Sequence, residues 1–429
     1  MSDANRVGLS AVKESVWGTT PASALEVIRF NSESLNANIE NITSQELRSD
    51  GQIADLVQVG ADSGGGVEFE LSYGGSSNIN DEIMAGVLFS SWIGVGDGIA
   101  TITSGTTVGN LDFVTSGSTL TLGSSVTHNI IEGIWIKIAG AASGNNTYHF
   151  VTDVTGNVIT VQTAFATDET LDETDAAIIS GEYLINGTTQ SSFTIERVHA
   201  DLTTTFFAWT GMVPGSMALN FTNKQIVTGS YTFMGKLPAT GVATVGTGAQ
   251  TAAGTNPIMS ASSNVGQIME GSTLTALSST YIQSLTLNVT KNLRAKEGIG
   301  TLGPVGVGSG TFNVTGSMSL YFADTTMYAK FVAATATGIS WKVEDTDGNA
   351  YVFTMPNIKF SQDTINATGI DTEVIENMEY QAIRHATYGH TLSICRFDES
   401  PSTFAPSASP SGSPSGSPSG SPSASPSGA

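Results

Sequence analysis

Apolar and polar residues alternate along three successive runs in residues 191–236. Phe193 and Ile195 alternate with Thr194 and Glu196, and the same two-residue period continues through residues 217–222 and 227–233. A period of two is typical of strands that bury one face and expose the other. The pattern therefore predicts a two-faced β-sheet, and the environment of its polar face becomes the central question about function.

The same alternation occurs on both sides of this stretch and predicts further strands. They cover residues 67–73, 284–293 and 310–322, a hairpin with arms at 339–343 and 351–355, and a last strand ending near Phe397. Two of the runs open with the tetrapeptide VTGS, at 227–230 and 314–317. This repetition fits a sandwich built from equivalent long strands but is weak proof of a repeat.

Two segments change to the helical period. In residues 78–92, Asn80 is the expected cap, Asp81 and Glu82 favour the first turn, and the apolar residues recur at helical spacing. In residues 324–334, Asp324 is the expected cap, and the residues expected to face inward are Tyr328, Phe331 and Val332. We therefore predict a mainly β fold, an antiparallel β-sandwich or barrel with one or two flanking helices.

Composition shifts along the chain predict its domain organisation. Short Gly, Ser and Thr-rich strands begin after Gly94, and long two-faced strands return after Glu182. We expect residues 1–94 and 183–399 to form one discontinuous β domain, and residues 95–182 a small inserted β domain. Residues 400–429 repeat SPSG and form a polar tail. The first 60 residues lack a compact pattern, which is more typical of a binding arm or loop than of core.

The charge and cysteine content make some functions less favourable than others. Acidic residues outnumber basic ones 38 to 16, giving a net charge of −22. Such a surface repels phosphate, so binding of nucleic acid through a basic patch is disfavoured. The single Cys395 cannot form a disulfide within the chain and is expected to be a small apolar strand residue rather than a reactive thiol. The chain begins without a secretory signal pattern, and no stretch of about 18 apolar residues predicts a membrane segment.

Candidate chemistry is sparse. Residues 298–303 match GxGxxG, but more glycines and a strand follow rather than the helix that a pyrophosphate needs. Asp345 and Asp347 resemble the start of a calcium loop, yet Ala350 and Pro356 occupy its sixth and twelfth positions. The five histidines do not take metal-ligand spacing. We therefore predict no enzyme activity, no cofactor, and no catalytic or metal-binding residues.

Several stretches, in order, resemble the major tail tube proteins of long-tailed, siphovirus-type bacteriophages. The resemblance covers most of residues 6–397, and it departs from the family in the 95–182 insertion and the SPSG tail. It is carried by ESVWGTTP at 14–21, NINDEIMAGVLFSSW at 78–92, INGTTQSSFTIER at 185–197, and then FAWTGMVPGSMALNF, IVTGSYTFMGK, NVTKNLRAKEGIGTLGP, VTGSMSLYF, MEYQAIRH and LSICRF.

The resemblance implies a structural subunit of the virion tail, made in the host cytoplasm. Its copies would form homohexameric rings, stacked helically into a tube that conducts double-stranded DNA into the host without binding it specifically. Other implied partners are tape-measure, terminator and distal tail proteins, with the insertion facing outward. The alternative is a bacterial surface or adhesion protein, against which stand the missing secretory signal and the lack of calcium-binding repeats.

In a closed tube, sheets join edge to edge and one face lines the channel. We expect the lumen to be lined by polar strand positions, although the same faces would meet solvent if the protein acted as a monomer. A candidate ring-stacking arm contains Leu35, Ile39 and Ile42. The candidate lumen residues are Glu68, Glu70, Ser72, Thr194, Glu196, Thr228, Ser230, Thr232, Thr315, Ser317 and Ser319.

Overall fold

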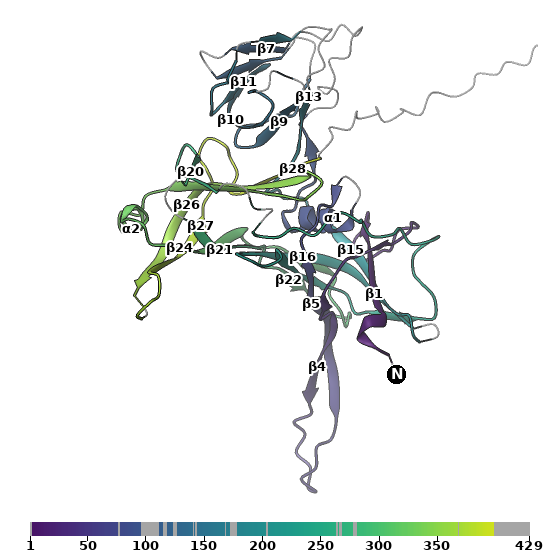
Figure 1. Ribbon diagram of the computed structural model, residues 1–429. Helices are drawn as coiled ribbons and strands as arrows, with labels where there is room; N and C mark the ends of the chain where they lie inside the picture. Colours follow the sequence, from purple (N-terminus) through teal and green to yellow (C-terminus); the bar gives the residue numbers. More distant parts are fainter. Residues whose placement is uncertain are drawn as a thin grey trace, which may run out of the picture.

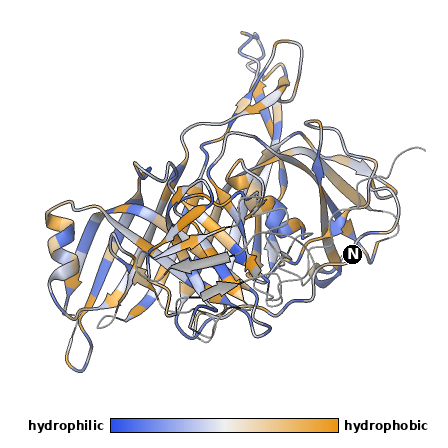
Figure 2. Cartoon of the chain, turned by 90° about the horizontal axis from the view of Figure 1, so that it is seen from above, coloured by the Kyte–Doolittle hydropathy of each residue, from blue (hydrophilic) through white to orange (hydrophobic). Residues whose placement is uncertain are grey.

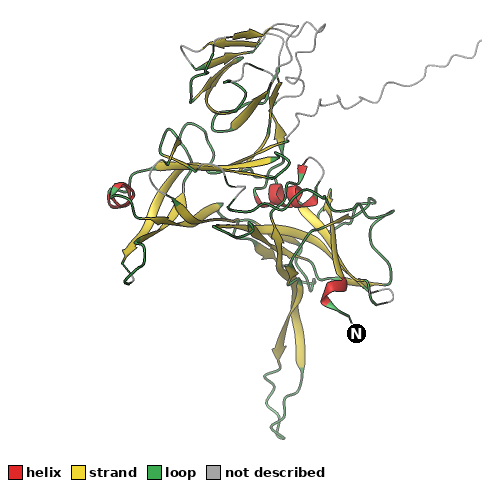
Figure 3. Cartoon of the chain, viewed as in Figure 1, coloured by secondary structure: helices red, strands yellow, loops and turns green. Residues whose placement is uncertain are grey.

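The computed structural model describes a mainly antiparallel β protein with two α-helices in the described part of the chain (Figures 1 and 3). The predicted class, an antiparallel β-sandwich, is confirmed. The SPSG tail lies outside the described residues. The structure describes residues 2–398, except 76–77, 96–110, 115–117, 123–126, 140, 142–143, 168, 172–177, 203–204, 263–264, 266–267, 278–280 and 368.

The alternating runs form the strands that the pattern predicts. The central stretch gives β15 (Ser192–His199), β16 (Phe206–Thr222) and β17 (Thr228–Gly235). Farther along the chain lie β21 (Ile282–Thr290) and β24 (Asn313–Tyr321). The strand predicted at 67–73 is the end of a longer strand, β5 (Leu56–Glu70). The alternation is visible along the strands as orange and blue bands (Figure 2).

Two 17-residue strands pass from one layer of the sandwich to the other. The first half of β16 pairs with β15, and after a register shift between Pro214 and Ser216 its second half pairs with β17 and β21. The first half of β26 (Ala350–Asn366) pairs with β25 (Thr337–Glu344) and β28 (Ser393–Phe397), and its second half with β27 (Ile375–Ala382). Irregularities of this kind bend strands and join the layers.

The core lies between the layers and is rich in aromatic side chains. Trp209, Tyr231, Trp341 and Phe353 are each no more than 1% exposed. Both VTGS segments place a glycine where an aromatic ring needs the space. A Cβ at Gly229 would lie 2.4 Å from Phe69 Cζ, and one at Gly316 would lie 2.3 Å from Tyr380 Oη. The shared tetrapeptide therefore has a packing reason on both strands.

Helix α1 (Ile79–Val87) packs against β16 and β1 (Val7–Glu14). It is shorter than the predicted 78–92, because Phe89 takes a left-handed φ of 53° just beyond its end. The predicted cap Asn80 is also wrong. Asn78 is the N-cap, and its side-chain Oδ1 accepts a hydrogen bond from Asn80 N at 2.9 Å.

Helix α2 (Thr326–Val332) lies near the turn into β25, and only part of its predicted orientation is right. Asp324 Oδ1 does accept Thr326 N at 2.7 Å, although Thr325 occupies the N-cap position. Of the residues expected inward, Phe331 packs on the core, whereas Tyr328 and Val332 are 45% and 64% exposed. Met327 is the buried residue of this helix.

The N-terminal region contains a strand that the pattern did not predict, β4 (Asn36–Thr43). It pairs with the first half of β5 in a long hairpin that projects from the body of the protein (Figure 1). We call residues 36–62 the arm. The remaining elements are short: η1 (Ala4–Arg6), β2 (Glu26–Val27), β3 (Ser32–Glu33), β6 (Ile93–Gly94), β14 (Glu182–Ile185), β18 (Ala239–Gly241), β19 (Met269–Glu270), β20 (Thr275–Ala276), β22 (Arg294–Lys296) and β23 (Gly306–Gly308).

The described strands between residues 111 and 180 form a separate seven-stranded sheet, on the side of the molecule away from the arm (Figure 1). Its core is continuous with Val352, Cys395 and Phe397 of the main β domain. Trp135 Nε1 also donates to Thr354 Oγ1 at 3.0 Å. Removing the insertion would therefore expose apolar surface on β26 and β28. Its strands are β7 (Leu111–Val114), β8 (Thr119–Thr121), β9 (Trp135–Ala139), β10 (Tyr148–Thr155), β11 (Val158–Val161), β12 (Glu169–Leu171) and β13 (Ile178–Ser180).

Candidate functional surfaces

One continuous sheet carries most of the predicted polar positions on a single face. The strand order β5, β17, β16, β21, β24, β27 and the end of β26 follows from the pairings. Directly opposed residues project from the same side of a sheet. We call this side the polar face. One row across it runs Glu70, Thr228, Asn220 and Thr286, and a second runs Glu68, Ser230, Ala218, Asn288, Thr315 and Gln381.

Eight of the predicted lumen positions share this polar face, while the residues between them point into the core. Three of those core-facing residues, Phe69, Tyr231 and Met318, are between 1% and 3% exposed. The polar face is therefore a thin hydrophilic layer on a sheet with a fully buried opposite side. The eight positions are Glu68, Glu70, Thr228, Ser230, Thr232, Thr315, Ser317 and Ser319.

Thr194 and Glu196 do not belong to the polar face, because both side chains are fully buried. Thr194 Oγ1 donates to Glu14 Oε1 at 2.9 Å. Glu196 accepts hydrogen bonds from Thr244 Oγ1 at 2.8 Å and Val245 N at 2.7 Å. Residues far away in the sequence thus cover the second face of β15. We remove both residues from the candidate lumen set.

Ser72 also leaves the candidate set. It lies just beyond β5, is 9% exposed, and forms an isolated bridge with Ile258. The backbone of residues 258–260 therefore pairs edge to edge with the chain at this point, where the β5–β17 ladder has ended. Leu35 is a further correction, because it is 3% exposed and packs in the main core, so it anchors the arm rather than forming its contact surface.

The arm itself presents apolar side chains to solvent. Ile39 and Ile42 are 55% and 58% exposed, and Leu47 at the tip is fully exposed. Other exposed apolar residues of the arm are Ile53, Leu56, Val57 and Val59. A concentration of exposed apolar side chains on a projecting hairpin is typical of a contact surface between proteins.

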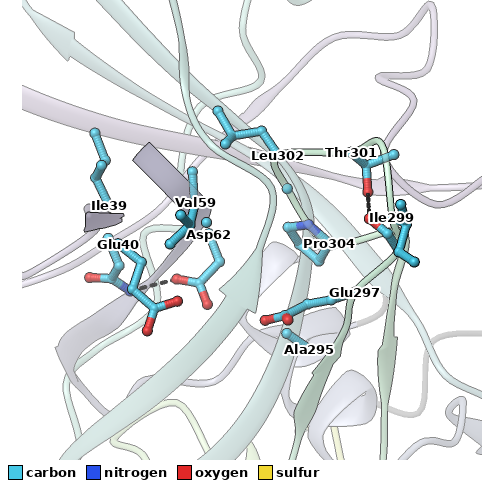
Figure 4. A pocket seen from close by; sticks show the side chains of 15 residues that line it. Ile39, Glu40, Val59, Asp62, Ala295, Glu297, Ile299, Thr301, Leu302 and Pro304 are labelled. Carbon is cyan, nitrogen blue, oxygen red and sulfur yellow. Dashed lines mark hydrogen bonds between the residues drawn. The ribbon is translucent and has the colours of Figure 1, made fainter. Parts of the chain in front are cut away.

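An open groove of about 690 Å³ lies where the arm meets the loop that connects β22 and β23 (Figure 4). A backbone hydrogen bond from Ala61 N to Leu302 O, 2.9 Å long, ties the loop to the arm. Three carboxylates line this groove together with apolar side chains, and its lining residues include no Lys or Arg. The side chains that line the groove include Ile39, Glu40, Val59, Asp62, Glu297, Ile299 and Leu302.

A carboxyl pair lies on the β26–β27 hairpin, away from the polar face. Glu376 is 1% exposed, its carboxyl group is hydrogen-bonded to that of Asp363, and neither carboxyl forms an ion pair with a Lys or Arg among the described residues. Burial, together with the nearby carboxylate of Asp363, raises the pKa of Glu376 from 4.5 to about 7, and Asp324 adds to the effect. Burial also raises the pKa of Asp363. The folded protein therefore holds a proton at this pair that the unfolded chain releases.

We expect Glu376→Gln to stabilise the protein at pH 8 by about 1–3 kcal/mol and to change little at pH 4. A raised carboxyl pKa means that stability is lost as the pH rises from about 4.5 to about 7, and the amide removes this loss. Urea unfolding of wild type and Glu376→Gln at a series of pH values measures this difference in the free energy of unfolding. Glu379→Gln, an exposed change on the same strand, is the matched control. Parallel pH profiles of wild type and Glu376→Gln would contradict the assignment.

The described residues offer little for catalysis. They contain no group of three His, Cys, Asp or Glu side chains placed to hold a metal ion. Cys395 lies in strand β28, as predicted; it is buried, and burial raises the pKa of its thiol to about 12. Burial lowers the pKa of His390 to about 4. None of the helices in the described part of the chain has the length and apolar character needed to span a bilayer.

These surfaces, a two-faced sheet, a projecting apolar arm and an adjoining groove, define a β subunit equipped for contacts with other proteins. A family model described as phage tail tube protein matches residues 4–382. The chain therefore belongs to the phage tail tube family and is a component of the virion tail. No curated protein matches the chain.

Proposed function

We propose that this protein forms homohexameric rings that stack into a tube and conduct double-stranded DNA into the host cell. The observation that supports it is the polar face, which continues in register across β5, β17, β16, β21, β24 and β27. Family membership makes a structural, non-enzymatic role the natural one. It also disfavours the alternative of a bacterial surface protein. Synthesis in the host cytoplasm and contacts with tape-measure, terminator and distal tail proteins are part of the proposal.

The sheet has edges at which neighbouring subunits can join. The second half of β26 pairs with β27 on one side, and residues 360–366 have no strand on the other side among the described residues. At the opposite end, Ser32 and Glu33 pair with β5 and form the outer strand. Unpaired strand edges are ready templates for pairing. Joining the two edges would close the sheets into a ring with the polar face inside.

The residues on the polar face suit a channel that must not retain DNA. Glu68, Glu70 and Glu379 supply negative charge, and most other positions are Ser, Thr or Asn. Lys359, which pairs with Gln381, is the cation at the margin. Carboxylates repel the phosphate backbone, and short hydroxyls keep water between protein and DNA. The inserted domain packs against β28 and the first half of β26, which belong to the layer that does not carry the polar face, and it is proposed to face outward.

Negative-stain electron microscopy of the purified protein tests the assembly. We expect rings with six-fold symmetry and hollow tubes, with the polar face on the inner wall in a subsequent reconstruction. A protein that remains monomeric at all concentrations and salt conditions would contradict the proposal. So would a tube in which Glu68 and Glu70 lie on the outer wall.

We expect the double substitution Glu68→Lys and Glu70→Lys to leave assembly intact but to slow or stall DNA release. The two lysines in each subunit would surround the DNA with cations that bind phosphate, and salt would weaken this binding. The rate of DNA release from phage carrying the variant, measured at low and raised salt, checks it. Glu68→Gln with Glu70→Gln is the control that removes charge without adding a cation. Unchanged release of the lysine variant at low salt would show that this strand does not face the DNA.

A further inference from the structure

The turn between β16 and β17 exposes a cation beside apolar side chains. Lys224 is exposed and forms no ion pair with the described residues. Ile226 follows two residues later in the chain, and Ile258 and Tyr281 lie on the two segments whose backbone pairs with this turn; the three side chains are 45%, 39% and 75% exposed. We call these four residues the knob. The backbone fixes the knob in place, since Ile226 bridges Ser260 and Asn223 N donates to Gln283 O at 2.9 Å.

The knob and the groove lie at opposite ends of the same strands. At the knob end of β17, Thr228 pairs with Glu70, and at the other end Gly235 pairs with Ser63, next to the groove residue Asp62. Eight residues of strand span roughly 25 Å. Neither surface can therefore reach the other within one subunit, but each is available to another copy.

The two surfaces are complementary in charge and polarity. The groove has Glu40, Asp62 and Glu297 and no Lys or Arg among its lining residues. Its apolar part is open, with Val59 and Leu302 45% and 47% exposed and Ile299 fully exposed. The knob carries the opposite charge, on Lys224, and its other side chains are apolar or aromatic like those of the groove. Cations are scarce in this protein, since the whole chain has only 16 Lys and Arg against 38 acidic residues. An exposed lysine that forms no ion pair with the described residues is therefore a distinctive partner for the acidic groove.

We propose that the knob of one subunit docks in the groove of a subunit in the next ring, with Lys224 directed at the carboxylates. This inference rests on the proposed tube and names one of its axial contacts. Two different patches at opposite ends of one subunit make a head-to-tail contact, which repeats without closing and extends a stack. Each contact is small, but all subunits of a ring engage together and strengthen one another.

Charge reversal tests the docking. We expect Lys224→Glu and Glu297→Lys each to raise the protein concentration needed for tube formation about tenfold, because each puts like charges in the contact. Combining both substitutions in one chain should return the value to within about threefold of wild type, since the pair is restored in reversed order. Circular dichroism and thermal unfolding confirm that these surface variants are folded. Tubes that form equally well in all three variants would overturn the proposal.

Disulfide crosslinking gives an independent readout, because the native Cys395 is 0% exposed and contributes no background. With Lys224→Cys and Ile299→Cys in the same chain, oxidised tubes should show a ladder of covalent oligomers, and single rings should show none. Val158→Cys with Ile299→Cys is the control, since Val158 lies in the insertion. Tubes without a ladder would refute the docking but leave the tube intact, whereas a wild type that forms no rings or tubes would refute both. A ladder in isolated rings would place the contact within a ring and also overturn the proposal.

Discussion

Replacing Arg396 with alanine is expected to destabilise the folded protein by about 3–5 kcal/mol, because it leaves a buried carboxylate without its cation. Arg396 and Asp81 have side chains only 4% and 3% exposed, and their charged atoms lie 2.5 Å apart. Arg396 also pairs with Glu182 and stacks on Trp92, with its guanidinium 4.1 Å from the ring centre. The arginine thus joins α1, β14 and β28. Chemical denaturation, followed by tryptophan fluorescence, measures the loss.

Arg294→Ala is the matched control, because Arg294 is exposed and should change stability by less than about 0.5 kcal/mol. Combining Arg396→Met with Asp81→Asn should recover part of the loss, since no buried charge then remains unpaired. The single Arg396→Ala variant should also gain relative stability as the pH falls and Asp81 becomes protonated. A loss below about 1 kcal/mol, or a double variant no more stable than the single one, would show that the ion pair does not carry this effect.

The sequence predicts the sheet well where one face is buried and the other is exposed. β17, β24 and β21 from Ser284 onward alternate between the core and the polar face, so their residues could be assigned to faces without a structure. Pairing register then brings eight separated positions onto one surface. The ends of α1 could not be predicted in the same way. The backbone geometry at Asn78 decides which residue caps the helix, and that at Phe89 decides where the helix ends.

The alternation of apolar and polar residues does not predict the structure correctly where both faces of a strand have the same environment. β15 is buried on both sides, because Glu14 and the loop at 244–245 cover Thr194 and Glu196, and nothing near β15 in the sequence announces these partners. Strand β4 is the opposite case, because it is exposed on both sides rather than buried on both sides. Most of its residues are exposed on either side, and Ile39 and Ile42, three residues apart, suggest a loose helical spacing rather than a strand. The arm was therefore predicted as a region but not as a hairpin.

Shortening the arm is expected to abolish stacking of rings into tubes while leaving the rings and the subunit fold intact. Thr43 pairs with Leu56, so residues 44–55 can be replaced by Asn-Gly, which suits a two-residue hairpin turn. The deletion removes the exposed Leu47 and Ile53, which are 103% and 75% exposed. These side chains contribute nothing to the core, so the free energy of unfolding should change by less than about 1 kcal/mol.

Electron microscopy and sedimentation of the shortened protein distinguish rings from tubes. Ile42→Ser with Leu56→Ser, which keeps the full length of the arm but lowers its apolar surface, should lengthen the assembly lag and shorten the tubes without eliminating them. The groove remains in both variants, because it is lined by Ile39, Glu40 and Val59 on the retained part of the hairpin. Loss of tubes in the shortened protein would therefore report on the arm tip and not on the groove. Tubes of normal length would show that the exposed apolar tip serves some contact other than the axial one.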